Sequence, residues 1–174
     1  ATQSGVASFE LELGGDFWAN TPSRWLFGID YGRTQPQALR SMCAKQNADV
    51  RIFDGSWTIN QEGFIPRRDF HAKMALLMNP VANLFAMIVG SGNFSSNGLR
   101  KSIEAGASVF VEDGNEFGSI LGPNVALANS LWEGATPALD ILDEYEEKWS
   151  ASFSRRVAQN QDNEAVDQNL SDIF

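Results

Sequence analysis

The sequence predicts an α/β protein in which a mixed β-sheet is flanked by helices, and three observations support this. An apolar segment, a helical segment and a second apolar segment follow one another within residues 25–53, which is the order of a β-α-β unit. Two further apolar segments, 71–78 and 84–90, are joined by a short Asn/Pro connection that is typical of an antiparallel hairpin. A length of 174 residues suits a single domain with a sizeable core.

The β-α-β unit begins with the apolar residues 25–32, WLFGIDYG, which indicate a buried strand ended by glycine. Residues 35–46 carry Pro36 in their first turn and repeat their apolar positions with a helical period. Four apolar residues share one face of this helix: Ala38, Leu39, Met42 and Cys43. Residues 49–53, DVRIF, indicate a second strand. Two strands in this order favour a parallel pair.

Turn residues and periodicity also divide the rest of the chain. Glycine and proline mark its interruptions, such as Gly122-Pro123, and the longest amphipathic pattern lies near the end of the chain. The predicted elements are a loop or hairpin at 54–69, the hairpin strands at 71–78 and 84–90, one or two helical turns at 95–102, a strand at 104–112, a helical stretch at 115–135 interrupted near Gly122-Pro123, and a helix at 139–159.

The charges are unevenly distributed along the chain. The formal net charge is −9, which at first argues against a nucleic-acid partner. Residues 133–174 hold ten acidic and three basic residues, whereas residues 60–110 hold five basic and three acidic ones. We therefore expect a main domain over residues 1–132 with a mildly basic middle. Residues 133–174 would form an acidic helical extension packed on this domain or following it.

Composition excludes several classes of site. Cys43 is the sole cysteine, so an internal disulfide and a cysteine-based zinc site are both excluded. No apolar run approaches the roughly 20 residues that span a membrane, and the N-terminus has no signal-peptide pattern. We expect a cytoplasmic protein without a membrane partner, a metal site or a cofactor.

A group of polar residues interrupts the apolar hairpin. His71, the only histidine, stands two residues before Lys73, so both side chains of a strand there would point to one face. Ser91 and Asn93 have the same spacing at the end of the neighbouring segment, and Glu104 opens the next predicted strand. Imidazole can attack a phosphodiester without a metal, and an ammonium with hydroxyl and amide donors can stabilise the extra negative charge of the transition state.

At these residues the sequence resembles the phospholipase D-like superfamily. The family pattern is His-x-Lys, then Gly-Ser-x-Asn, then often a glutamate eleven residues after the asparagine. Here it reads His71-Ala72-Lys73, Gly90-Ser91-Gly92-Asn93 and Glu104, with that spacing. The resemblance covers residues 25–112 and implies a phospholipase D-like fold. It also implies that His71 is the nucleophile, that Lys73, Ser91 and Asn93 bind phosphate, and that Glu104 orients the histidine.

One position departs from the family's fuller motif, which has an aspartate where this chain has Met78. Nuclease and restriction-type branches often lack this aspartate, whereas lipid-cleaving enzymes usually keep it. The resemblance therefore implies a metal-independent phosphodiesterase, a nuclease that cleaves DNA through a phosphohistidine, in restriction or defence. The alternatives are a phospholipase D or phosphatidyltransferase, and a non-catalytic nucleic-acid-binding module.

Further residues are candidates for substrate contact. Six would meet the DNA backbone: Arg67, Arg68, Gly90, Gly92, Arg100 and Lys101. The two arginines before the hairpin are as readily explained as solvated loop charges. An ordinary turn is the less favoured alternative for the Gly-Ser-Gly-Asn sequence. In the family a second histidine protonates the leaving oxygen, but this chain has only His71. The resemblance therefore implies a homodimer with one composite active site on a two-fold axis.

Overall fold

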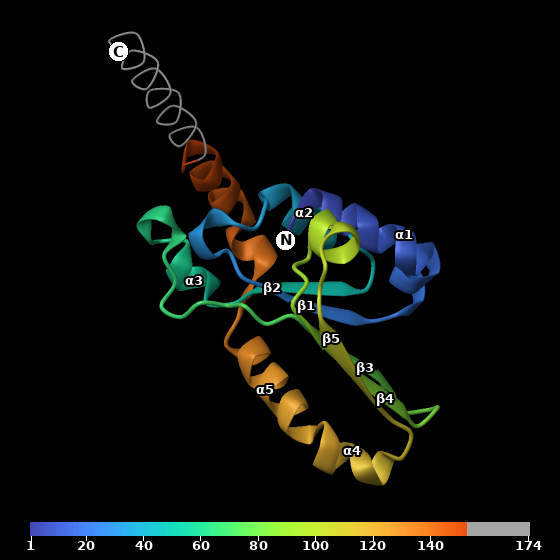
Figure 1. Cartoon of the computed structure of the whole chain (residues 1–174). Coiled ribbons are helices and arrows are strands. Elements are labelled where there is room, and N and C mark those ends of the chain that lie inside the picture. Colours follow the sequence, from blue (N-terminus) through green and yellow to red (C-terminus); the bar gives the residue numbers. More distant parts are fainter. Residues whose placement is uncertain (153–174) are drawn as a thin grey trace, which may run out of the picture.

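The computed structural model describes residues 1–152 and has a mixed α/β architecture with two small sheets flanked by helices (Figure 1). In the first sheet, β1 (Ser23–Phe27) pairs in parallel with β2 (Ala48–Ile52), and the short β6 (Thr136–Pro137) pairs antiparallel with β2. The helix α2 (Pro36–Cys43) connects β1 to β2. The predicted β-α-β unit is therefore confirmed.

The second sheet is antiparallel, with β4 (Leu84–Gly90) between β3 (Met74–Asn79) and β5 (Gly106–Val111). The predicted hairpin and the strand after it are present, but β3 begins at Met74, so the expectation that His71 and Lys73 lie within the strand was wrong. The expectation of one continuous mixed sheet was too simple, because β3 pairs with β4 and not with either strand of the parallel pair. Residues 65–73, which connect the two sheets, contain no helix or strand.

Helices account for most of the remaining described residues. The N-terminal α1 (Gln3–Asn20) was not predicted; Thr2 caps it by accepting from the Gly5 N–H at 3.1 Å, and it kinks at Gly14, where φ is 73°. The predicted interruption near Gly122 separates α4 (Gly114–Ile120) from α5 (Gly122–Glu133). The shorter elements are η1 (Asp30–Gly32), α3 (Gly55–Thr58), η2 (Glu62–Phe64) and the π-helical turn η3 (Asn97–Lys101).

The main core lies between the first sheet, α1, α2 and the helix of residues 138–152. Its fully buried large side chains include Ile29, Leu39, Met42, Ile52, Leu142 and Tyr145. The Tyr145 hydroxyl donates to the Thr34 carbonyl at 2.6 Å, and Trp149 Nε1 donates to the Gly32 carbonyl at 2.7 Å. The C-terminal helix therefore belongs to this core. The rest of the predicted helix, residues 153–159, lies outside the described residues.

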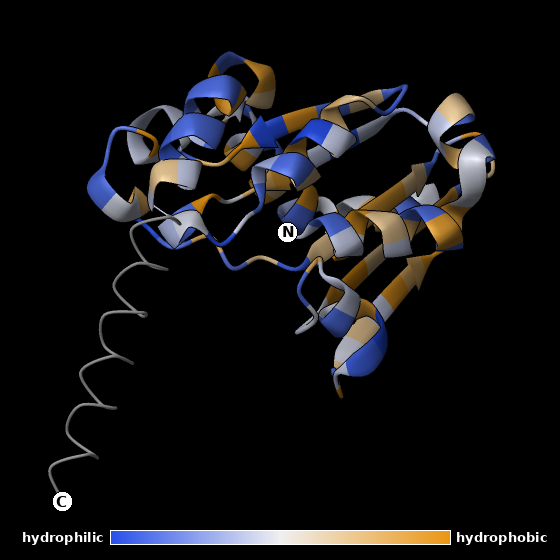
Figure 2. Cartoon of the chain, turned by 90° about the horizontal axis from the view of Figure 1, so that it is seen from above, coloured by the Kyte–Doolittle hydropathy of each residue, from blue (hydrophilic) through white to orange (hydrophobic). Residues whose placement is uncertain are grey.

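The second sheet is covered on one face only. Phe85, Val111 and Leu121 form a small buried cluster there, and the Phe117 ring of α4 lies 4.4 Å from the Phe85 ring. Register partners on the opposite face include Leu77, which is 50% exposed, and Phe110, which is 66% exposed. Figure 2 shows apolar residues along these strands. The apolar sequence of β3 does not reflect burial: even on the covered face Met74 and Met78 are 37% and 57% exposed, because β3 is an edge strand and α4 packs on β5 at the other edge.

No helix within residues 1–152 combines the length and apolar character needed to cross a membrane.

Tyr145→Phe should lower the free energy of unfolding by about 1–3 kcal/mol, because the buried Thr34 carbonyl loses its donor. Urea denaturation followed by circular dichroism measures this change. Glu147→Gln, on the exposed side of the same helix, is the matched control and should change the free energy by less than about 0.5 kcal/mol. An unchanged urea midpoint for Tyr145→Phe would contradict this account of the core.

Candidate phosphodiester site

His71 and Lys73 lie immediately before β3. The Gly90 N–H donates to the Lys73 carbonyl at 3.0 Å, so the backbone ladder between β3 and β4 extends to Lys73. The His71 side chain is 57% exposed, and Lys73 Nζ donates to the His71 backbone carbonyl at 2.9 Å. The imidazole is thus exposed to solvent, and the ammonium lies against the backbone of the same residue.

The sequence Gly-Ser-Gly-Asn leaves the end of β4 and turns beside the start of β5. The Ser91 N–H donates to the Ala105 carbonyl at 2.9 Å, and Ser91 Oγ accepts from the Ala105 N–H at 3.1 Å. Ser91 Oγ also donates to the carboxylate of Glu104. These bonds join the serine and the glutamate of the predicted site into one unit.

Two glycines allow this turn to pack tightly against η3. A Cβ atom on Gly92 would lie 2.8 Å from the Gly98 carbonyl oxygen, and one on Gly98 would lie 2.4 Å from the Asn93 carbonyl oxygen. Both approaches are shorter than real Cβ contacts, so larger residues would displace the backbone that carries Asn93. Gly92 was expected to contact substrate, and the structure gives it this second, local role.

The antiparallel register brings the predicted site residues to one end of the second sheet. Gly90 pairs with Gly106 and bonds to Lys73, so β3 begins, β4 ends and β5 begins at the same place. His71 and Lys73, the Ser91–Asn93 turn and Glu104 all flank this end. Glu104 bonds to Ser91, and its proposed role in orienting His71 remains a prediction.

Three polar residues near His71 were missed in the sequence. Asp69 Oδ2 lies 3.8 Å from His71 Nε2, and Asp69 Oδ1 accepts from the Tyr31 hydroxyl at 3.0 Å. The buried Asp30 accepts from the Phe70 N–H at 2.7 Å. The Tyr31 hydroxyl donates a hydrogen bond to Asp69, and this bond raises the pKa of the phenol. Only the spacing of Asp69, two residues before His71, pointed to this arrangement.

Of the four cationic residues expected to contact DNA, two form ion pairs with carboxylates and two are exposed. Arg67 Nε donates to Asp54 at 2.9 Å, and this ion pair raises the pKa of Arg67, whose guanidinium also lies 5.0 Å from the centre of the Trp57 ring. Arg100 donates to Glu12 at 2.8 Å. Arg68 and Lys101 are exposed. Another cation, Arg33, lies over the Tyr31 ring at 5.1 Å.

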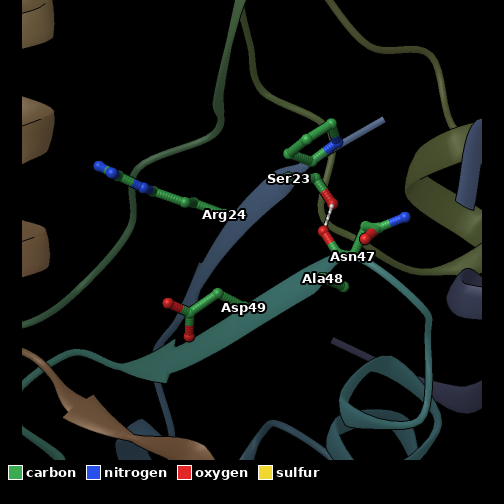
Figure 3. Close-up of a pocket in the computed structure, with 6 residues that line it drawn as sticks. Ser23, Arg24, Asn47, Ala48 and Asp49 are labelled. Carbon is green, nitrogen blue, oxygen red and sulfur yellow. Dashed lines mark hydrogen bonds between the residues drawn. The ribbon is translucent and has the colours of Figure 1, made fainter. Parts of the chain in front are cut away.

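An open pocket of about 430 Å³ lies elsewhere, at the amino ends of β1 and β2 (Figure 3). Its lining residues are Pro22, Ser23, Arg24, Asn47, Ala48 and Asp49. Ser23 Oγ donates to the Asn47 carbonyl at 3.3 Å across it. The pocket contains none of the predicted site residues. The His71 segment instead adjoins the carboxyl ends of these strands, where ligands bind in open α/β sheets.

No protein-family model matches the chain, and no curated protein matches its sequence. Within residues 1–152, no group of three or more histidine, cysteine, aspartate or glutamate side chains is placed to hold a metal ion.

Gly98→Ala should destabilise the protein by about 1–3 kcal/mol, because the added methyl group overlaps the Asn93 backbone. Gly118→Ala is the matched control: its Cβ would meet no atom within 4 Å, and alanine favours the helix α4 by about 0.5–1 kcal/mol. Urea denaturation of both variants gives the comparison. Equal stabilities would show that the turn does not need the close approach.

Proposed function

We propose that this protein is a metal-independent phosphodiesterase, a nuclease that cleaves DNA through a covalent phosphohistidine at His71. The observation that supports it is the shared sheet end, where the antiparallel register gathers His71, Lys73, the Ser91–Asn93 turn and Glu104. The family resemblance of the same five residues points to the same chemistry, and the absence of the family's aspartate at Met78 favours DNA over phospholipid. A restriction-type role in the cytoplasm belongs to the same proposal.

The proposed reaction has two displacements at phosphorus. A neutral ring nitrogen of His71 attacks the phosphorus atom and expels one ester oxygen, which takes a proton as it leaves. The Lys73 ammonium and the Asn93 side-chain amide stabilise the negative charge of the five-coordinate transition state, and the Ser91 hydroxyl joins them when it turns from Glu104 to the phosphate. Water then attacks the phosphohistidine, loses a proton to a base, and releases His71 and the phosphate monoester.

The leaving oxygen needs an acid, and the water needs a base, but His71 is the only histidine of the chain. We propose that a second copy of the chain supplies this group, so that two imidazoles face one phosphate across a two-fold axis. The proposed enzyme is therefore a homodimer with one composite site.

Cleavage of DNA by the wild-type chain should be unchanged in excess EDTA, because no step uses a metal ion. Single-stranded DNA, duplex DNA, RNA and phosphatidylcholine vesicles are assayed in parallel, so that phospholipase activity is also detected. His71→Ala should abolish cleavage, and Lys73→Ala should slow it by roughly 10²-fold or more, as for loss of a transition-state donor. Inhibition by EDTA that Mg²⁺ reverses would exclude the histidine mechanism. Binding of DNA without cleavage would instead favour the non-catalytic module.

The composite site makes a separate prediction for mixed dimers. Wild-type and His71→Ala chains are unfolded, combined in equal amounts and refolded. Activity is compared with that of wild-type protein at the total protein concentration of the mixture. Random pairing leaves about a quarter of the dimers with two imidazoles, so about a quarter of the activity should remain. Retention of half the activity would mean that each chain works alone with another acid.

A further inference from the structure

We propose that Asp69, and not Glu104, is the carboxylate that positions the His71 imidazole, and that Asp30 and Tyr31 hold Asp69 and its segment in place. The inference rests on the proposed function only for the chemistry of His71. The positioning itself concerns contacts that exist without substrate. It assigns a role to Asp30 and Tyr31 of η1, which the proposed reaction does not otherwise use.

Two consecutive residues after β1 hold the two consecutive residues before His71. The carboxylate of Asp30 accepts from the Phe70 N–H at 2.7 Å, and the Tyr31 hydroxyl donates to Asp69 Oδ1 at 3.0 Å. Asp30 is only 5% exposed, so its bond fixes the Phe70 backbone in a water-poor setting where hydrogen bonds are strong. The histidine follows directly after this fixed point.

Ring packing and a glycine support the same attachment. The Phe70 ring stacks on Phe53, just after β2, with their centres 5.0 Å apart. A Cβ atom on Gly28 would lie 3.2 Å both from Asp30 Oδ1 and from the Phe70 side chain, so a larger residue there would crowd the carboxylate and the ring. The segment before His71 is therefore attached to the carboxyl ends of both parallel strands.

Asp69 links the attached segment to the imidazole. Its Oδ1 accepts from Tyr31, which leaves Oδ2 directed at His71 Nε2, 3.8 Å away. A carboxylate that accepts the N–H of one ring nitrogen fixes the tautomer and leaves the lone pair of the other nitrogen free to attack. At 3.8 Å this contact is longer than a hydrogen bond, and the proposed bond forms when the ring nitrogen approaches Oδ2.

Glu104 contacts a different partner, the Ser91 hydroxyl, through its Oε2 atom. Its carboxylate accepts from Ser91 Oγ, which in turn accepts from the Ala105 N–H at 3.1 Å. These two bonds orient the serine hydroxyl at the turn. In this proposal the two carboxylates have separate tasks: Asp69 positions the nucleophile, and Glu104 holds the Ser91 turn.

Because His71 is the only histidine, nuclear magnetic resonance of chains with isotope-labelled histidine reports on this one imidazole. Ring relaxation and ring chemical shifts are measured on the full chain, with and without Tyr31→Phe, Asp69→Asn and Glu104→Gln. We expect Tyr31→Phe and Asp69→Asn to increase ring motion and shift the ring signals, and Glu104→Gln to leave both nearly unchanged. Asp69→Glu, which keeps the carboxylate, should restore part of the order.

Tyr145→Phe is the matched control, because it removes the same hydroxyl from a tyrosine of the main core. It should lower stability but leave the His71 signals unchanged. In cleavage assays, Asp69→Asn should lower kcat by about 10-fold or more with little change in KM, as for loss of a residue that positions another.

The positioning role and the proposed nuclease function can be disproved separately. If Tyr31→Phe and Asp69→Asn fold normally and leave ring motion and ring shifts as in the wild type, the positioning role is wrong. If Glu104→Gln alone releases the ring, Glu104 holds that role. If the ring responds as expected but the wild-type chain cleaves no phosphodiester, the positioning stands and the proposed nuclease function fails.

Discussion

The antiparallel register of the second sheet is the constraint on which the candidate site depends. Because Gly90 pairs with Gly106 and its N–H bonds to Lys73, the start of β3, the end of β4 and the start of β5 meet at one place. Residues up to 33 positions apart in the chain, from His71 to Glu104, thereby become neighbours of one sheet end. A shift of one residue between β3 and β4 would turn Lys73 to the opposite face.

The two sheets are tied together through the segment that precedes this site. Asp30 holds the Phe70 backbone and Phe53 stacks on the Phe70 ring, so the carboxyl ends of the parallel pair fix where the second sheet begins. The site end of the second sheet is therefore coupled to the main core. Its far end, near the β3–β4 turn, has support only from α4 and the small cluster around Phe85.

Local sequence signals predicted most of the elements but not their burial. The β-α-β order, the hairpin and the break near Gly122 follow from periodicity and turn residues, and all are present. The helix α1 was missed because Gly5, Gly14 and Gly15 lower helix propensity and its apolar residues have no clear helical stripe. The exposure of β3 depends on its position at the edge of the sheet away from α4, which no local pattern encodes.

For the candidate site, the sequence predicted which residues gather but not which contacts they make. Motif spacing placed five residues at one sheet end, but it could not show which carboxylate faces which partner. The bond between Tyr31 and Asp69 joins residues 38 positions apart in a chain whose tight turn at Tyr31 has a left-handed φ of 55°. Neither the turn nor the pairing has a periodic signature, so both required the folded chain.

The uncovered face of the second sheet has a consequence for the behaviour of the protein in solution. Apolar side chains such as Leu77 and Phe110 favour clustering of molecules, and the outer backbone edges of β3 and β5 offer hydrogen-bonding groups to neighbours. The net charge of −9 opposes this by mutual repulsion. Colloidal stability therefore depends on pH and ionic strength, and it is lowest near the isoelectric point of about 4.5 and in concentrated salt.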